Sequence, residues 1–207
     1  MKYSKLLILI IFILLVDQCL KIYIKTHFYY GQEVALLGSW FRLHFIENEG
    51  MAFGMKFGDA SIAKLVLTLF RLVAVGFGFY YLNVMIKKGF KNATLICAAL
   101  ILAGAFGNLI DSIFYGKLFS ESGFCLAQWV PWGKGYANLF YGRVVDMLYF
   151  PLIEWTLPSS TPFIGAYTIR FFEPVFNIAD ASISIGVLTL LFFQKRLLTL
   201  PKEVKTD

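Results

Sequence analysis

The sequence predicts an all-α integral membrane protein with four transmembrane helices, a small extracytoplasmic β-sheet and a long extracytoplasmic loop. Hydrophobic residues make up 58% of the 207 residues, and charged residues only 15%. A soluble domain usually has about 25% charged residues. Four stretches are apolar over the roughly 20 residues that a membrane-spanning helix requires. Because no stretch reads as a linker, we expect residues 1–207 to form a single membrane-embedded domain.

The four predicted spans cover residues 5–24, 62–86, 93–114 and 175–193. The first could be mistaken for a cleaved secretory signal, because Lys2 and Lys5 precede an apolar run. Asp17, Gln18 and Lys21 follow that run, however, and no small-residue cleavage site of the A-x-A type is found there. We therefore expect the first helix to remain in the protein.

Lysine and arginine residues gather in three short segments, and their positions predict the orientation of the spans. They precede the first span, fill the link between the second and third, and follow the fourth: Lys2, Lys5, Lys87, Lys88, Lys91, Lys195, Arg196, Lys202 and Lys205. Such residues are retained on the cytoplasmic side. Both termini are thus predicted to be cytoplasmic, with the connections 27–61 and 115–174 outside. This retention accounts for the net charge of +6, so we expect no nucleic-acid partner.

The first outer connection contains two short stretches of β-favouring residues. These are residues 34–37 and 41–46, and Gly38 and Ser39 between them are typical of a turn. We expect a small sheet at the membrane surface. In contrast, neither cysteine nor histidine residues cluster with metal-ligand spacing, and Cys125 alone falls in an outer connection. We therefore expect no disulfide, metal or cofactor.

Polar residues recur at one end of three spans, where each must find a partner away from lipid. They are Asp17, Gln18 and Lys21 in the first span, Asn108 and Asp111 in the third, and Asn177 and Asp180 in the fourth. The predicted orientation places all of them at the outer ends of their spans. Asp146 reaches the same level from the second outer connection. We therefore expect polar groups from four segments to converge at one depth.

Asp146 and Asp180 are the strongest candidates for chemistry among these groups. Ionised carboxylates near bilayer depth are costly, and without close cations they stabilise a structure poorly. Two carboxylates about 3 Å apart can share one proton, which supplies an acid and a base for amide hydrolysis. Alternatively, Asp180 caps or salt-bridges the end of its helix. Arg143 either orients Asp146 or contacts lipid headgroups.

Five blocks of residues occur in a set order along the chain: Asp17, Gln18 and Lys21; Asn48, Gly50, Ala52 and Phe53; Gly104, Gly107, Asn108 and Asp111; Val145 and Asp146; Phe176, Asn177, Ala179 and Asp180. Together they resemble the prolipoprotein signal peptidases, also called signal peptidase II. The resemblance implies an aspartyl endopeptidase in the bacterial cytoplasmic (inner) membrane, with its site towards the periplasm. It also implies that diacylglyceryl-modified prolipoproteins are cut on the N-terminal side of the lipidated cysteine, in contact with membrane lipid.

The same resemblance implies roles for individual residues. Asp146 and Asp180 would be catalytic. The site-supporting or substrate-binding residues would be Asp17, Lys21, Asn48, Gly50, Gly104, Asn108, Asp111, Asn177 and Ala179. Simpler roles remain open for most of them: an ion pair within one helix for Asp17 and Lys21, contacts between helices for the asparagines, a turn at Asn48 and Gly50, and close helix packing at Gly104. We expect a monomer.

Two departures from the family pattern stand out. The family usually has an arginine after the aspartate of the third span, where this chain has Ser112. The stretches 115–141 and 151–173 are also longer than is typical of the family.

Other functional classes compete with the peptidase. An ion-coupled transporter would place carboxylates nearer the midplane and is often built from inverted repeats, and a noncatalytic assembly factor would need neither aspartate.

Overall fold

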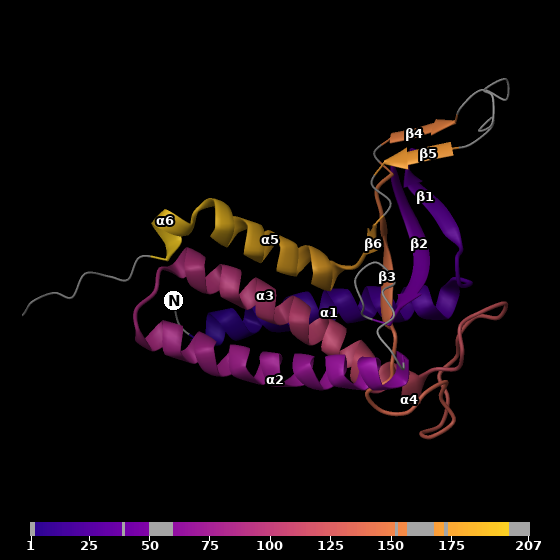
Figure 1. Cartoon of the computed structure of the whole chain (residues 1–207), viewed down its shortest axis with the longest axis horizontal. Coiled ribbons are helices and arrows are strands. Elements are labelled where there is room, and N and C mark those ends of the chain that lie inside the picture. Colours follow the sequence, from indigo (N-terminus) through magenta and orange to yellow (C-terminus); the bar gives the residue numbers. More distant parts are fainter. Residues whose placement is uncertain are drawn as a thin grey trace, which may run out of the picture.

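The computed structural model describes residues 3–38, 40–49, 60–151, 153–156, 168–171 and 174–198. A bundle of apolar helices carries a small antiparallel sheet across one end (Figure 1). The bundle consists of α1 (Tyr3–His27), α2 (Ala60–Lys87), α3 (Asn92–Ile110) and α5 (Ile178–Phe192). The start of α1, the α2–α3 link and the short helix α6 (Gln194–Leu197) lie at the end opposite the sheet (Figure 1).

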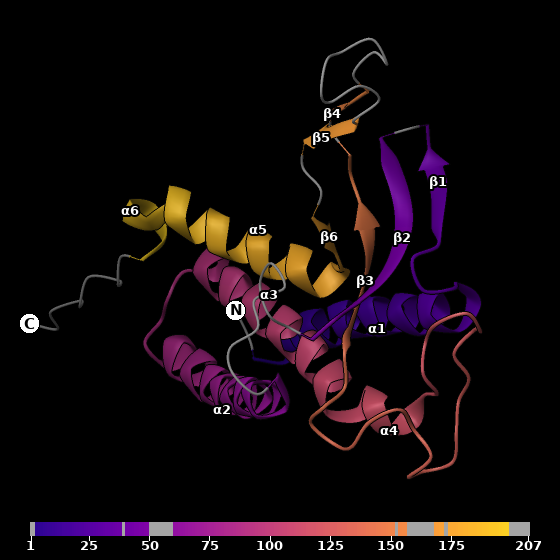
Figure 2. The same cartoon turned by 45° about the vertical axis from the view of Figure 1, so that its right-hand side comes forward.

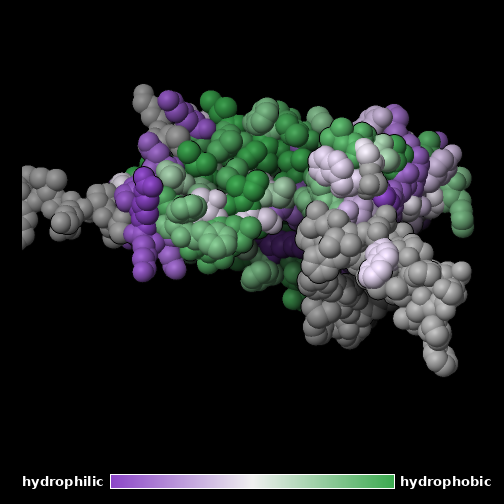
Figure 3. Space-filling model, turned by 90° about the horizontal axis from the view of Figure 1, so that it is seen from above, coloured by the Kyte–Doolittle hydropathy of each residue, from purple (hydrophilic) through white to green (hydrophobic). Residues whose placement is uncertain are grey.

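Three helices are long and apolar enough to cross a membrane: Tyr3–His27, Ser61–Lys87 and Asn92–Leu118. They contain the first three predicted spans. The third helix continues past the predicted end at residue 114 through a π-helical turn, η2 (Asp111–Tyr115), and one further turn, α4 (Gly116–Leu118). Hydrophobic residues cover the helices between two more hydrophilic ends (Figure 3). This surface matches the fold class expected of a membrane protein.

The predicted start of the fourth span, at residue 175, is wrong. Val175–Phe176 form strand β6, and the helix begins at Ile178. The Asn177 side chain accepts a hydrogen bond from the Asp180 backbone N–H at 2.8 Å, while the Asp180 carboxylate receives the Asn177 N–H in return. This reciprocal cap ends the strand and starts the helix. With 15 residues α5 is about 22 Å long, and it is shorter than the other three bundle helices.

The predicted hairpin is present as β1 (Glu33–Leu37) and β2 (Phe41–Asn48), which pair antiparallel. Two strands that the sequence analysis missed, β3 (Val144–Tyr149) and β6, extend it to the order β1-β2-β3-β6 (Figure 2). Strand β3 is buried almost throughout, so it lacks the alternation that marks a half-exposed strand. A separate hairpin, β4 (Ile153–Thr156) and β5 (Thr168–Phe171), follows it.

A second hydrophobic core, beneath the sheet, anchors the stretch that follows α4. Phe45, Tyr115, Phe119 and Met147 pack together there and are almost fully buried. The Lys25 side chain is also fully buried beside them. Its ammonium group pairs with Glu47, donates to Ser122 Oγ at 2.8 Å and lies over the rings of Phe119 and Tyr136. These contacts attach the stretch to α1 and to the sheet.

Helix α3 is the centre of the bundle and packs against α1, α2 and α5. Gly104 permits its close approach to α5, because an added Cβ would collide with the Ala179 carbonyl oxygen and lie 2.7 Å from Ile183 Cγ1. Helix packing in membranes depends on small residues that let backbones approach in this way. The packing role left open for Gly104 is therefore seen directly.

We expect Gly104→Ala to lower the free energy of unfolding by roughly 1–3 kcal/mol, the usual cost of overpacking. Gly76→Ala on α2 is the matched control, because an added Cβ there meets nothing within 4 Å. Unfolding in detergent micelles, followed by circular dichroism, measures both. Equal stability of the two variants would contradict a tight α3–α5 contact.

Candidate active site

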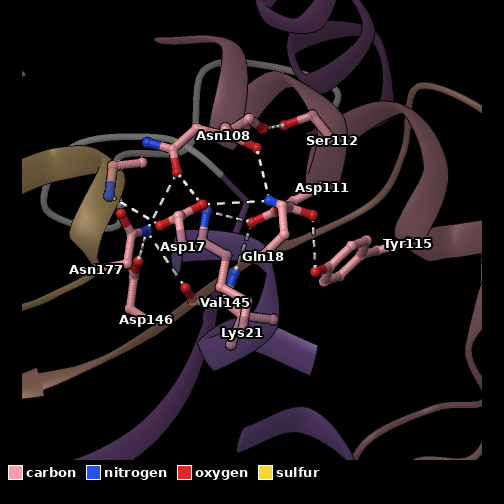
Figure 4. A network of polar contacts seen from close by, with 12 residues as sticks. Asp17, Gln18, Lys21, Asn108, Asp111, Ser112, Tyr115, Val145, Asp146 and Asn177 are labelled. Atoms are coloured by element: carbon pink, nitrogen blue, oxygen red, sulfur yellow. Dashed lines mark hydrogen bonds and ion pairs between the residues drawn. The ribbon is translucent and has the colours of Figure 1, made fainter. Parts of the chain in front are cut away.

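Polar side chains from α1, α3, β3 and α5 meet where the bundle reaches the sheet (Figure 4). The structure brings together nine of the residues singled out in the sequence: Asp17, Lys21, Asn48, Asn108, Asp111, Asp146, Asn177, Ala179 and Asp180. Gly50, with Ala52 and Phe53, lies outside the described residues. In the described part of the chain, every buried side-chain nitrogen or oxygen has a hydrogen-bond partner.

Lys21 is the central cation of this cluster. Its Nζ lies 2.9 Å from Asp17 Oδ2 and 2.7 Å from Asp111 Oδ2, and it donates to Asn108 Oδ1 at 2.8 Å. The side chains of Lys21, Asp17 and Asp111 are almost completely buried. The ion pair within α1 is therefore only part of a network that also includes Asn108 of α3 and Asp111 of η2.

The two carboxylates beside Lys21 connect it to α5 and to the sheet. Asp17 Oδ1 accepts the Ala179 backbone N–H at 2.9 Å, in the first turn of α5, where a negative charge is favourable. Asp111 accepts from Gln18 Nε2 at 2.8 Å and from the Val145 N–H at 3.4 Å. A Cβ on Gly107 would lie 2.8 Å from Asp17 Oδ2, so a glycine there leaves room for the carboxylate.

Asp146 and Asp180 lie on either side of Asn177. Asn177 Nδ2 donates to Asp146 Oδ1 at 2.6 Å, and its backbone N–H points to Asp180 Oδ2 at 3.4 Å. Asn108 Nδ2 donates to Asp180 Oδ1 at 2.7 Å, and the Asn48 side chain hydrogen-bonds Asp146. Asp146 is buried, whereas Asp180 is half-buried. The asparagines thus hold both carboxylates and at the same time join helices.

Burial, and then the negative charge of Asp180, raise the pKa of Asp146 to about 7. The negative charge of Asp180 thus acts on Asp146, and Asp146 is the more deeply buried of the two carboxyl groups.

The alternative roles left open for Asp180 and Arg143 can be compared with the structure. Asp180 does take part in the helix cap, which was its alternative role, but its hydrogen bond to the Asn177 N–H is long. Arg143 does not serve as the partner of Asp146, because it donates to Glu47 at 3.1 Å and to Glu121 at 2.5 Å.

One face of α2 carries a group of polar residues that was not predicted from the sequence. Lys64 Nζ donates to the Glu49 carbonyl oxygen at 2.7 Å, and Thr68 Oγ1 donates to that of Phe140 at 3.0 Å. Arg71 Nη1 donates to Ser112 Oγ at 3.3 Å. A guanidinium group therefore contacts the residue that stands where the family usually has an arginine. The signal that could have found them is two cations, seven residues apart, inside an apolar span.

Known proteins resemble this chain in sequence and in fold. The family model described as signal peptidase (SPase) II matches residues 9–195. A lipoprotein signal peptidase of Porphyromonas gingivalis is 50% identical over 193 residues, which cover 93% of this chain and 83% of the relative. One of Amoebophilus asiaticus is 38% identical over 184 residues, covering 87% and 73%. A solved structure described as a bacterial membrane enzyme shares the fold, with a TM-score of 0.56 and 21% identity over 98% of this chain and 96% of the other.

We expect Lys21→Met to lower the free energy of unfolding by about 3–5 kcal/mol, because it leaves two buried carboxylates without their cation. Arg42→Met is the matched control, since Arg42 pairs with Glu33 at the surface and such a pair contributes about 1 kcal/mol or less. Thermal unfolding in micelles provides the comparison. If adding Asp17→Asn and Asp111→Asn to Lys21→Met restores none of the loss, charge is not the cause.

Proposed function

Because this chain belongs to the signal peptidase II family, we propose that it removes the signal peptide from prolipoproteins in the bacterial membrane. Its substrate carries a diacylglyceryl group on a cysteine, and the cut falls on the N-terminal side of that cysteine. Asp146 and Asp180 form the aspartyl dyad. The observation that carries the proposal is the pairing of a buried carboxyl group with a half-buried one across Asn177.

In the proposed mechanism Asp146 carries the shared proton and Asp180 is the base. The raised pKa of Asp146 supports this assignment, and the greater exposure of Asp180 suits a group that must reach water. Asp180 takes a proton from water as the water oxygen attacks the scissile carbonyl carbon, and Asp146 protonates the carbonyl oxygen. Collapse of the gem-diol breaks the C–N bond, and the dyad returns a proton to the leaving amine. One bond is hydrolysed for each water consumed.

The remaining site residues hold this pair in place in the proposed mechanism. Asn177, Asn108 and Asn48 orient the two carboxylates. Asp17, Lys21, Asp111 and the Ala179 N–H fix the helix ends that carry them. Preorganised donors of this kind cost no rearrangement during the reaction. Gly104 contributes by letting α5 approach α3.

The proposal includes a membrane topology for the single domain 1–207, which acts as a monomer. Helices α1, α2, α3 and α5 are its four spans, and α6 continues beyond α5 at the end where the Lys87 and Lys88 link lies (Figure 1). Retention of basic residues puts this end in the cytoplasm and the sheet at the periplasmic face of the inner membrane. Diacylglyceryl chains then remain in lipid while the scissile bond meets water at the dyad.

Asp146→Asn and Asp180→Asn should each lower cleavage of a diacylglyceryl-modified prolipoprotein by at least about 1,000-fold, because either change removes the acid or the base. Glu33→Gln on β1 is the matched control and should keep full turnover. The assay uses purified protein in lipid-containing micelles, with a size-exclusion profile to establish that each variant is folded. Near-normal turnover by a folded aspartate variant would favour a transporter or an assembly factor.

The rate of cleavage should fall as the pH rises through about 7. Above this pH Asp146 loses its proton, both carboxylates become ionised, and no acid remains to protonate the carbonyl oxygen. Initial rates of kcat/KM across this range measure the effect. Samples returned to a lower pH should recover full activity, which separates titration from unfolding. A rate that stays level or rises through pH 7 would be inconsistent with Asp146 as the acid.

A further inference from the structure

We propose that Arg71 on α2 is a positioning residue for the dyad, whose guanidinium balances the negative charge that Asp146 and Asp180 share. This inference rests on the proposed function. It assigns a role to a residue outside the five sequence blocks, on a helix that supplies none of them.

The first observation is a shortage of positive charge at the site. Four carboxylates gather there, those of Asp17, Asp111, Asp146 and Asp180. Lys21 is committed to the first two, at 2.9 and 2.7 Å. Even with one proton shared by Asp146 and Asp180, the dyad keeps one negative charge that Lys21 does not contact directly. A half-buried carboxylate of this kind needs a further cation nearby.

Arg71 is the cation that α2 brings to this charge. The carboxylates that act on it electrostatically are Asp180, Asp111 and Asp146, in decreasing order. Lys64, two turns away on the same face of α2, is held on the Glu49 carbonyl oxygen, and Arg143 is held by Glu47 and Glu121. The charged groups that act on Arg71 from η2, β3 and α5 are therefore acidic.

The contacts of Ser112 explain how the guanidinium is oriented. Its Oγ accepts from Arg71 Nη1 at 3.3 Å and donates to the Asn108 carbonyl oxygen at 2.9 Å. The Asn108 side chain in turn donates to Asp180 at 2.7 Å. The end of α3 and the start of η2 thus hold both the arginine and the carboxylate. A rigid, planar guanidinium suits this arrangement better than a flexible ammonium group.

The experiment compares Arg71→Gln, Arg71→Lys and Lys87→Gln with wild type. Lys87→Gln is the matched control, because it removes one positive charge from the exposed, far end of the same helix. Cleavage of a synthetic diacylglyceryl lipopeptide in micelles is measured as kcat against pH. In parallel, infrared spectroscopy follows the protonated carboxyl band of the dyad with pH, identified as the band that Asp146→Asn removes.

For Arg71→Gln we expect kcat to fall by about 10- to 100-fold and the pH–rate profile to move about one unit to higher pH. The sign follows because loss of a cation makes each deprotonation of the dyad harder. The infrared band should persist to higher pH by the same amount. Arg71→Lys should restore the position of the profile with a reduced rate, and Lys87→Gln should match wild type.

Two results would overturn this role. One is an Arg71→Gln protein that is folded and keeps the wild-type profile and infrared titration. The other is equal damage in Arg71→Gln and Arg71→Lys with the profile unmoved, which would make Arg71 a packing residue. If wild type fails to cleave the lipopeptide, the proposed function is at fault, and the infrared titration still decides the role of Arg71.

Discussion

The buried ammonium group of Lys21 is the interaction on which the rest of the site depends. It contacts Asp17 within its own helix, Asn108 on α3 and Asp111 on η2. A charge in such surroundings is tolerated only when it is paired and hydrogen-bonded. The aspartates that satisfy it also accept the backbone N–H groups of Ala179 and Val145. The carboxylates that pair with Lys21 therefore also contact the first turn of α5 and strand β3.

This arrangement separates the work of the four carboxylates. Asp17 and Asp111 share a cation, whereas Asp146 and Asp180 receive mainly amide donors from asparagines. An amide does not change charge with pH, so it can orient a carboxyl group in either protonation state. In the proposed mechanism the pair that receives amides shares a proton, whereas the pair that contacts Lys21 joins the helices. The proposed chemistry and the framework thus use the same residue type in different surroundings.

The sequence predicted the helical part of the fold well, because an apolar run of the required length leaves few alternatives. It also placed Lys21 with Asp111, and Asn177 with Asp180, at one depth of the bundle. It could not predict strand β3, since a buried strand has no alternation, nor the capped start of α5 at Ile178. The contact of Arg71 with the site was likewise not predictable from the sequence. Its contact with Ser112 joins residues 41 positions apart, and no local pattern reports such a contact.

The two stretches expected to be longer than is typical of the family precede and follow one strand in the sequence. Strand β3 spans residues 144–149, with the stretch 115–141 before it and 151–173 after it. Its register is set by antiparallel pairing with β2 and β6, and Asp146 faces Ile46 of β2 in that pairing. Hydrogen bonds along the strand, not the lengths of its connections, therefore determine where Asp146 lies. Because loop length costs little free energy, both stretches can lengthen without moving the carboxyl group that the proposed reaction requires.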